Sequence, residues 1–303
     1  MKKNMLDLSI ILPAFNEDNV IGQVINEIHT VLQKDYQGSY EILVIDDGSE
    51  DSTAEFAEKA GARVISHPHN IGNGAAVKTG IRESSGKILV MMDADGQHSP
   101  EDIPRMLKEI ERYDMVVGAR NSSSDTDLHR DIGNKIYNAL ATYVSDRKIE
   151  DLTSGFRAIK RNIAWKFVYL LPNTFSYPST ITLAVLRSGG SLTYIPIETK
   201  RRIGKSKIRL IKDGLRFLII ILRISSYYSP LKIFLPMSAL MFLTGFGYGL
   251  YKVLFLNTRY GPTSAMIMTV SVVVFMVGLV SEQVAQLRYL WSERIQDNEK
   301  FDD

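Results

Sequence analysis

The segment Lys87-Ile-Leu-Val-Met-Met-Asp-Ala-Asp-Gly-Gln97 decides the fold prediction for this chain. Its apolar half has the length and composition of a buried β-strand, and oxygen-bearing side chains follow at alternate positions, Asp93, Asp95 and Gln97. Because a strand turns alternate residues to one face, all three converge if the extended conformation continues past Met92. Such hard oxygen ligands suit Mg²⁺ or Mn²⁺. A solvated strand end with two surface aspartates has the same sequence, so the surrounding residues must decide.

The first 200 residues alternate short apolar, β-branched runs with helical patterns. This alternation is typical of an α/β fold with a mainly parallel sheet flanked by helices. The predicted strands are Leu8–Leu12, Tyr40–Ile45, Ala62–Ser66, Ile88–Met92, Met115–Val117 and Leu192–Ile195. The predicted helices are Glu17–Gln33, Ser52–Ala60, Gly74–Ser84, Pro100–Arg112, Asp131–Val144 and Pro178–Arg187.

Polar clusters follow three of these predicted strands. Pro13-Ala-Phe-Asn-Glu17 follows the first, Asp46-Asp-Gly-Ser49 the second, and the group from Asp93 to Gln97 the fourth. Each cluster alone has the composition of an ordinary turn. Parallel strands, however, bring their carboxyl ends to one edge of the sheet, which is where ligands bind. The three clusters together therefore predict a binding site at that edge.

A glycine pair gives a weaker signal for a different nucleotide site. Gly72-Asn-Gly74 lies between a predicted strand and a predicted helix, and Asp93 follows about twenty residues later, as in a dinucleotide-binding fingerprint. Val77 stands where the third glycine is required, and the stretch 68–70 makes the turn long. We therefore reject a nicotinamide site and keep open a close approach of this backbone to another nucleotide.

Two long uncharged runs, Ile233–Tyr251 and Thr263–Ser281, stand in the last third of the chain. Each is about as long as a helix that crosses a bilayer, and the turn-forming stretch 257–262 separates them. Two buried core helices are the alternative, but the runs are apolar on all faces. We predict a transmembrane hairpin with spans of about 231–256 and 263–287.

Basic residues surround the two ends of this hairpin, whereas its connecting loop carries only Arg259. The positive-inside bias predicts a multi-pass protein of the cell membrane with both termini on the cytoplasmic side. The residues 206–229 have the pattern of interfacial amphipathic helices. The predicted organisation is a cytoplasmic α/β domain over 1–205, the interfacial segment, the hairpin over 230–290 and a cytoplasmic tail over 291–303.

Composition excludes several other classes. The 36 basic and 34 acidic residues nearly balance, which does not suggest a nucleic-acid surface. The chain has no cysteine and therefore no disulfide or thiolate metal site. The apolar start is too short for a signal peptide, and Asp7 and Pro13 interrupt it.

The motifs now described resemble family-2 glycosyltransferases of the GT-A fold. The resemblance rests on Leu12-Pro-Ala-Phe-Asn-Glu17, Val44-Ile-Asp-Asp-Gly-Ser49, Asn70-Ile-Gly-Asn-Gly74 and Asp93-Ala-Asp-Gly-Gln97. A narrower resemblance, to the polyprenyl-phosphate group that includes dolichol-phosphate mannose synthase and bacterial undecaprenyl-phosphate glycosyltransferases, rests on Val117-Gly-Ala-Arg120, Ser154-Gly-Phe-Arg157 and Gly204-Lys-Ser-Lys207. It covers about the first 210 residues, and the predicted hairpin suits the same group.

The resemblance implies an enzyme that transfers a sugar, with inversion, from a GDP- or UDP-sugar to a dolichyl or undecaprenyl phosphate. It implies Mg²⁺ or Mn²⁺ on the diphosphate, held by Asp93, Asp95 and Gln97. The implied donor-nucleotide residues are Pro13, Ala14, Phe15, Glu17, Asp46, Asp47, Gly74 and Ala94. The implied residues for the acceptor phosphate and a closing loop are Arg120, Arg130, Arg201, Arg202, Lys205, Ser206 and Lys207. The implied catalytic residues are Asp95, Arg120 and Arg130.

An acceptor phosphate would be anionic near neutral pH, so the predicted site needs cations to hold it and no carboxylate base. Arginines recur between Arg120 and Lys207, and guanidinium groups bind phosphate bidentately. For Arg157, in the same stretch, a solvated surface cation and a phosphate ligand remain equal alternatives. The segment Phe175–Thr180 lacks the acidic residue that many relatives carry, which leaves the sugar open.

Two other functions remain open. A membrane polysaccharide or glycolipid synthase would share the fold, but the chain lacks the Gln-x-x-Arg-Trp motif of processive synthases and has a single predicted hairpin. A non-catalytic, membrane-tethered nucleotide-binding protein would not need the Asp93–Gln97 group or the basic loop. Oligomers could form through the hairpin in any of these cases.

Overall fold

The computed structural model describes residues 5–120, 138–139, 141–143, 145–173, 177–199 and 229–301, with side chains in the last segment up to residue 287. The chain divides into two compact units, residues 1–213 and 214–303. The first unit contains the three polar clusters of the predicted site, and the second contains the two long apolar runs.

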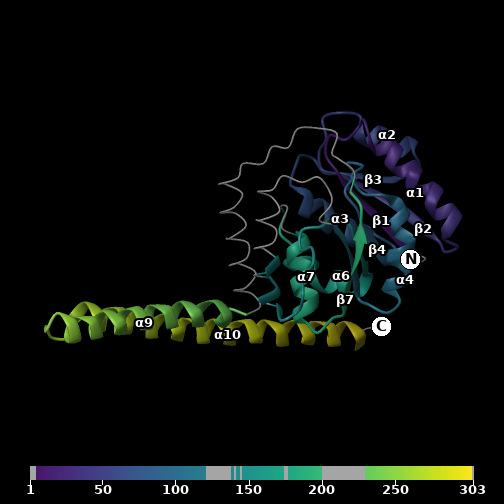
Figure 1. The fold of residues 1–303 in the computed structure, drawn as a ribbon. Helices are drawn as coiled ribbons and strands as arrows, with labels where there is room; N and C mark the ends of the chain where they lie inside the picture. Colours follow the sequence, from purple (N-terminus) through teal and green to yellow (C-terminus); the bar gives the residue numbers. More distant parts are fainter. Residues whose placement is uncertain are drawn as a thin grey trace. The chain divides into compact units, whose positions relative to one another are not determined.

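A seven-stranded sheet forms the centre of the first unit, in the order β3-β2-β1-β4-β6-β5-β7 (Figure 1). The strands are β1 (Leu6–Ala14), β2 (Tyr40–Asp46), β3 (Arg63–Ser66), β4 (Gly86–Met91), β5 (Met115–Arg120), β6 (Arg157–Lys160) and β7 (Leu192–Ile197). Neighbours pair parallel except at β6, which pairs antiparallel with both β4 and β5. The prediction of a mainly parallel sheet is thus confirmed.

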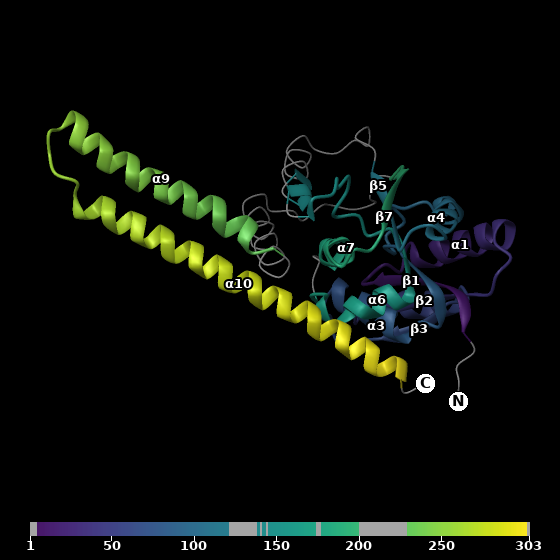
Figure 2. The ribbon, with the colours of Figure 1, turned by 90° about the horizontal axis from the view of Figure 1, so that it is seen from below.

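Helices cover both faces of the sheet (Figure 2). They are α1 (Ile21–Asp35), α2 (Thr53–Lys59), α3 (Asn73–Glu83), η1 (Pro100–Asp102), α4 (Ile103–Ile110), α6 (Arg161–Phe167), η2 (Val168–Leu170) and α7 (Tyr177–Arg187). Alternate residues of β1 show the two layers. Ile10 and Leu12 join a buried cluster with side chains of α1, α2 and α4, whereas Ile11 lies against Gly80 of α3 on the opposite face. Because both faces are covered, the central strands are continuous apolar runs.

The six predicted strands are confirmed, but β6 and α6 were not predicted. β6 has four residues and begins with the charged Arg157, so its pattern does not stand out from a loop. The helix predicted over Glu17–Gln33 begins later, at Ile21, and ends at Asp35. Most of the helix predicted over Asp131–Val144 lies outside the described residues.

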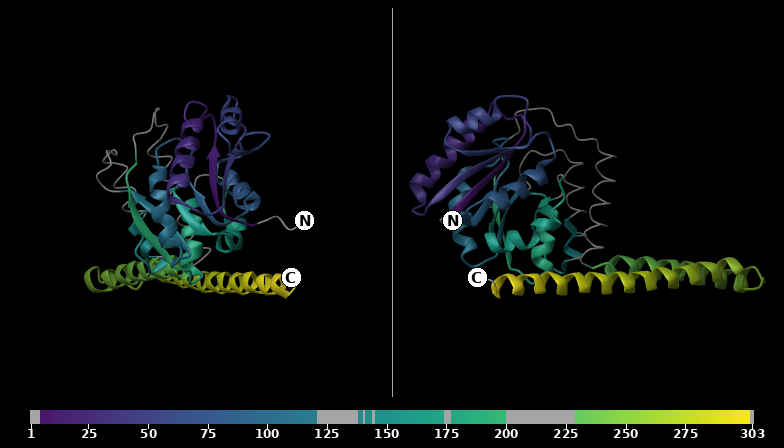
Figure 3. Two further views of the ribbon diagram at one scale, coloured as in Figure 1. Left: turned by 90° about the vertical axis from the view of Figure 1, so that its right-hand side faces the viewer. Right: turned by 180° about the vertical axis from the view of Figure 1, so that it is seen from behind.

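The second unit is an antiparallel pair of long helices, α9 (Leu231–Phe255) and α10 (Pro262–Phe301), which lie side by side (Figure 3). Small residues allow their close approach, since a Cβ atom at Gly278 of α10 would lie 2.5 Å from the Cβ of Phe234 on α9. At the open end of the pair, the Glu282 carboxylate accepts a hydrogen bond from the backbone N–H of Leu231, at the start of α9. The predicted hairpin is therefore present as a packed helix pair.

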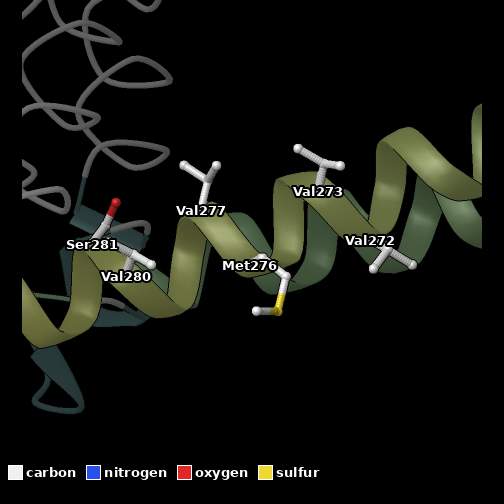
Figure 4. A pocket seen from close by; sticks show the side chains of 6 residues that line it. All are labelled: Val272, Val273, Met276, Val277, Val280 and Ser281. Atoms are coloured by element: carbon white, nitrogen blue, oxygen red, sulfur yellow. The ribbon is translucent and has the colours of Figure 1, made fainter.

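Most of the hairpin surface is exposed and apolar. The stretches Leu231–Phe255 and Pro262–Leu287 have mean hydropathies of 1.6 and 2.2, and only 17% of each is buried. Figure 4 shows one such surface on α10, formed by Val272, Val273, Met276, Val277, Val280 and Ser281. Both helices are long and apolar enough to cross a membrane, and water is a poor solvent for such a surface.

Candidate active site

The carboxyl ends of β2, β1 and β4 lie next to one another in the sheet. Ala14 of β1 pairs with Asp46 of β2, and Ile11 of β1 pairs with Met91 of β4. The polar segments that follow these three parallel strands therefore leave from one edge. This confirms the expectation that the three clusters share a single edge of the sheet.

Hydrogen bonds join the loop after β1 to the loop after β2. Asn16 has a positive φ of 55° and turns the chain at the end of β1. Its backbone N–H donates to Ser49 Oγ at 2.9 Å, and its own Oδ1 accepts from the N–H of Glu50 at 2.9 Å. The backbone N–H of Glu17 donates to Thr53 Oγ1 at 2.8 Å. This turn occupies the residues before Ile21, which is why α1 begins later than predicted, and it leaves Phe15 exposed.

Asp46 and Asp47 differ in what their carboxylates contact. Both are buried. Asp46 Oδ1 accepts the backbone N–H of Ser49, which closes the turn after β2. Asp47 accepts hydrogen bonds on both oxygens from the loop after β3, at 2.7 Å from His67 Nδ1 and at 2.7 Å from the N–H of Gly72. Asp47 therefore supports that loop, while Asp46 ends the strand at the shared edge.

The residues Asp93, Asp95 and Gln97 lie on a turn, so the extended conformation on which their convergence depended does not continue past Met92. β4 ends at Met91, and Gly96 has a positive φ of 71°. The N–H of Gln97 donates to Asp95 Oδ1 at 3.1 Å, a bond that closes an Asp-x-x turn. The three side chains thus stay in one short turn at the strand end, but strand alternation does not bring them together.

The carboxylate of Asp93 lies among groups from three other segments. His98 Nε2 is 3.7 Å from Asp93 Oδ2, and the Asn73 side chain at the start of α3 donates to it. Gly155 leaves room for this carboxylate, since a Cβ there would lie 2.5 Å from Asp93 Oδ2. Burial alone would raise the pKa of Asp93, but its interactions with His98 and Asn73 and the charge of Arg157 hold the pKa below its usual value. The side chain stays ionised and keeps 34% of its surface exposed.

Arg157 is a buried residue of β6, so neither reading from the sequence is correct. Its side chain is fully buried, and its guanidinium donates to the carbonyl oxygens of Ser154 and Pro178 and to Thr182 Oγ1. Burial lowers the pKa of this guanidinium. The residue braces the β6 end of the site and reaches no surface where a phosphate could bind.

Arg120, at the end of β5, forms a bidentate ion pair with Asp151. Its Nε lies 2.8 Å from Asp151 Oδ2 and its Nη2 lies 3.0 Å from Oδ1, and Nη2 also contacts Thr153 Oγ1 at 2.5 Å. Burial alone would raise the pKa of Asp151, but the ion pair with Arg120 and the N–H groups of Arg120 and Thr153 hold it below 3.8. Much of the charge of Arg120 is therefore neutralised within the protein.

The remaining predicted acceptor residues lie outside the described part of the chain. They are Arg130, Arg201, Arg202, Lys205, Ser206 and Lys207. Conversely, sequence reasoning missed His67, His98, Asp151 and Gly155. Gly155 stands in the quoted motif Ser154-Gly-Phe-Arg157, but the motif does not reveal its contact with Asp93. The other three stand in no residue pattern that marks their roles, because each contacts its partner through the fold.

The oxygen donors at the turn fit a hard divalent cation. Asp93 and Asp95 offer carboxylates and Gln97 an amide oxygen, which Mg²⁺ and Mn²⁺ accept readily. Among the described residues, no group of three or more His, Asp or Glu side chains could hold a metal ion by itself. A cation here would need further ligands from a bound diphosphate or from water, as is usual for Mg²⁺ on phosphate substrates.

Residues 9–168, more than half of the chain, match the model of the family described as Glycosyl transferase family 2. The chain belongs to this family. Residues 229–287 also match the family described as the GtrB C-terminal hairpin, which covers α9 and the apolar part of α10. The catalytic fold and the hairpin are thus recognised separately, in the two units of the structure.

Two relatives of this chain carry names that refer to polyprenyl phosphates. The chain is 29% identical over 184 residues to an undecaprenyl-phosphate 4-deoxy-4-formamido-L-arabinose transferase of Photorhabdus laumondii, covering 56% of each chain. It is 30% identical to a dodecaprenyl-phosphate galacturonate synthase of Rhizobium johnstonii, covering 52% of this chain and 49% of that protein. The match thus spans about half the length of these transferases. It spans 82% of an uncharacterized protein of Methanocaldococcus jannaschii, which is 32% identical over 65% of this chain.

Solved structures show the same fold. Glucosyl-3-phosphoglycerate synthase of Mycobacterium tuberculosis, in complex with Mn²⁺, uridine diphosphate and glucosyl-3-phosphoglycerate, superposes with a TM-score of 0.60. It is 20% identical, and the superposition covers 72% of this chain and 80% of that one. At this identity the likeness establishes the GT-A architecture of the first unit.

Proposed function

We propose that the protein transfers a sugar from a nucleoside-diphosphate sugar to a polyprenyl phosphate at the cytoplasmic face of a membrane. One observation carries the proposal. The acidic turn at Asp93 and Asp95 shares a sheet edge with Asp46, in a chain that also carries an exposed apolar hairpin. The first feature suits a nucleoside diphosphate and the second a lipid acceptor. The names of the Photorhabdus and Rhizobium relatives point to the same reaction class.

The donor would lie along the edge formed by β2, β1 and β4. Its nucleoside end would contact Asp46, Glu17 and the exposed ring of Phe15, with the backbone of Pro13, Ala14, Gly74 and Ala94 nearby. The joined loops after β1 and β2 fix these groups before the donor arrives, which lowers the entropy cost of binding. The carboxylate of Asp47 is engaged by the loop after β3, so we assign it an indirect role.

Asp93, Asp95 and Gln97 would hold Mg²⁺ or Mn²⁺ against the diphosphate. When bound there, the cation neutralises charge that develops on the leaving nucleoside diphosphate. The protein supplies ionised carboxylates. Interactions with His98, Asn73 and Arg157 keep Asp93 deprotonated despite its partial burial.

The acceptor needs no general base, because a phosphate monoester already carries an anionic nucleophile near neutral pH. Direct attack of that oxygen on the anomeric carbon displaces the nucleoside diphosphate and inverts the configuration. Arg120 would stand beside the acceptor phosphate. Since Asp151 neutralises much of its charge, the net positive charge must come from the residues outside the described part of the chain, Arg130, Arg201, Arg202, Lys205 and Lys207.

The hairpin would span the membrane twice, with residues 1–205 as the cytoplasmic catalytic domain and 206–229 at the interface. The flanking basic residues favour this orientation through the positive-inside bias. Lipid phosphate in the same leaflet could then reach the donor without leaving the membrane.

The test is transfer of label into lipid. The full-length protein is reconstituted in nanodiscs with undecaprenyl or dolichyl phosphate and incubated with Mn²⁺ or Mg²⁺ and a panel of radiolabelled UDP- and GDP-sugars. We expect one donor to yield label that partitions with extracted lipid, in proportion to the polyprenyl phosphate supplied. If no member of a broad panel labels the lipid while the protein binds nucleoside diphosphate, the assigned acceptor is wrong.

A further inference from the structure

His67 connects the loop after β3 to two neighbouring segments. Its Nδ1 lies 2.7 Å from Asp47 Oδ1 at the end of β2, and its Nε2 lies 2.9 Å from Thr79 Oγ1 on α3. The ring is largely buried, with 10% of its side-chain surface exposed, and the Asp47 side chain is 4% exposed. These contacts form one chain of hydrogen bonds, which we call the Asp47–His67–Thr79 chain.

The direction of the bonds follows from the chemistry of the ends. An ionised carboxylate only accepts hydrogen bonds, so Nδ1 of His67 carries a proton and donates it to Asp47. Nε2 shares its hydrogen bond with the hydroxyl of Thr79, which can either donate or accept. Each of the three side chains is thereby held in one orientation.

The same carboxylate also fixes the backbone of the 67–72 loop. Asp47 Oδ1 accepts the N–H of Ile71 at 3.1 Å, and Oδ2 accepts the N–H of Gly72 at 2.7 Å. The loop packs directly on Gly48, where an added Cβ would lie 2.5 Å from the carbonyl carbon of His69. The loop is thus held at its start by His67 and at its end by two backbone bonds.

This loop connects the two halves of the proposed donor site. At its start, the N–H of His67 donates to the carbonyl oxygen of Asp46 at 2.8 Å. Directly after its end, the side chain of Asn73 donates to Asp93. The residues between, from Pro68 to Ile71, are exposed at the sheet edge. The position of the loop therefore sets how Asp46 and Asp93 are presented to one ligand.

We propose that the Asp47–His67–Thr79 chain is a positioning device that sets the affinity for the donor nucleotide by holding the 67–72 loop. The inference rests on the proposed function, because it takes the ligand of this edge to be a nucleoside diphosphate. His67 acts through the loop and does not touch the reacting atoms. Its loss weakens donor binding and leaves the chemical step nearly unchanged.

Two substitutions of His67 separate positioning from general stability. In His67→Asn, the amide nitrogen takes the place of Nδ1, so the bond to Asp47 is kept and the bond to Thr79 is lost. In His67→Gln, the amide reaches the place of Nε2, so the bond to Thr79 is kept and the bond to Asp47 is lost. The matched control is His29→Asn, because His29 bonds to Tyr40 OH at 3.0 Å in a partly buried position on α1.

The experiment measures binding of UDP and of GDP, each with Mn²⁺, to the full-length protein in nanodiscs by titration calorimetry. We expect His67→Gln to raise the Kd of the nucleotide that the wild type binds by about tenfold, as for the loss of a hydrogen bond to a charged group. We expect His67→Asn to stay within about threefold of wild type and His29→Asn to leave the Kd unchanged. In transfer assays, the KM for the donor should rise with Kd in His67→Gln while kcat changes by less than about twofold.

An unchanged Kd in His67→Gln overturns the positioning role, and so does an equal rise in the control His29→Asn. A fall in kcat with an unchanged KM also overturns it, since that places His67 in the chemical step. If the wild type binds neither UDP nor GDP, the proposed function itself fails, and the inference fails with it.

Discussion

The proposed donor edge, at the ends of β1, β2 and β4, and the proposed acceptor side, around Arg120, are built in different ways. At the donor edge, short contiguous motifs directly follow β1, β2 and β4, and the loops after β1 and β2 are joined by hydrogen bonds such as that from the N–H of Asn16 to Ser49 Oγ. On the acceptor side, Arg120 pairs with Asp151, a residue that directly follows no strand and stands in none of the quoted motifs. The donor edge was therefore readable from motifs, whereas the partners on the acceptor side depend on tertiary packing.

The difference also concerns charge. The carboxylates Asp93 and Asp95 keep exposed surface at the edge, where a cation could reach them. On the acceptor side, the guanidinium groups of the described arginines bind other groups of the protein. Arg157 donates to carbonyl oxygens, and Arg120 donates to the carboxylate of Asp151. The comparison predicts that changes at the donor edge impair catalysis, whereas changes on the acceptor side first impair stability.

The largest effect is expected for Asp95→Ala. Removing this proposed cation ligand should lower transfer by about a thousandfold or more, because charge on the leaving diphosphate would no longer be neutralised. The melting temperature should stay within about 2 °C of wild type, since Asp95 lies on a surface turn. Radiometric lipid transfer and calorimetry measure the two quantities. Retained transfer in this variant would contradict the assignment of the turn.

A smaller effect on activity is expected for Gly155→Ala. The added methyl would lie 2.5 Å from Asp93 Oδ2 and must displace this carboxylate. A displacement of about 1 Å can cost about a hundredfold in rate, so we expect that loss of kcat together with weaker Mn²⁺ binding by electron paramagnetic resonance. Gly22→Ala is the control, because nothing lies within 4 Å of a Cβ at that position in α1. Equal activity of the two variants would show that Asp93 need not stay in place.

On the acceptor side, Asp151→Asn should reduce stability. The variant leaves Arg120 without its carboxylate partner, and loss of one member of a buried pair costs about 3 kcal/mol in the free energy of unfolding. The pKa of Asp151 is lower in the folded protein than its unfolded value of 3.8. The ion pair therefore stabilises the fold fully above that value, and its contribution is lost as the pH falls through the folded pKa.

The pH dependence gives the check. Denaturant unfolding of wild type and Asp151→Asn should differ most near neutral pH and progressively less below pH 3.8. A difference that stays constant into acid would mean that the carboxylate charge is not what stabilises this side.

The smallest effect is expected for Lys148→Ala. Lys148 pairs with Glu150 close to Asp151 in sequence, but its side chain is 84% exposed. Exposed ion pairs contribute little, so neither the melting temperature nor lipid transfer should change measurably. A clear loss of transfer would show that scattered surface cations contribute to acceptor binding, and would weaken the distinction between the two sides.

Much of the fold followed from pattern alone. The strands of the parallel core are apolar runs bounded by turn residues, and parallel pairing places their ends at one edge whatever the details of the loops. The strand β6 was not predicted because it is short and begins with Arg157, whose burial depends on carbonyl groups from Ser154 and Pro178. No local pattern reports such long-range compensation of a charge.

The candidate site was predicted in composition but not in conformation. Alternate spacing suggested that Asp93, Asp95 and Gln97 project from a strand, whereas Gly96 and the Asp95 carboxylate turn the chain. The preference of Asp-Gly for turns could have indicated this. The role of Asp47 was not predictable, since its hydrogen-bond donors His67 and Gly72 stand 20 and 25 residues further along the chain.

The most direct test of the account identifies both products of a single reaction. Wild-type protein in nanodiscs is given its labelled nucleotide sugar and a polyprenyl phosphate, and the released nucleotide and the extracted lipid are analysed together by mass spectrometry. We expect one nucleoside diphosphate to be released for each polyprenyl monophosphate that gains a sugar. Release of nucleoside monophosphate with a lipid diphosphate, or of free sugar without modified lipid, would contradict it.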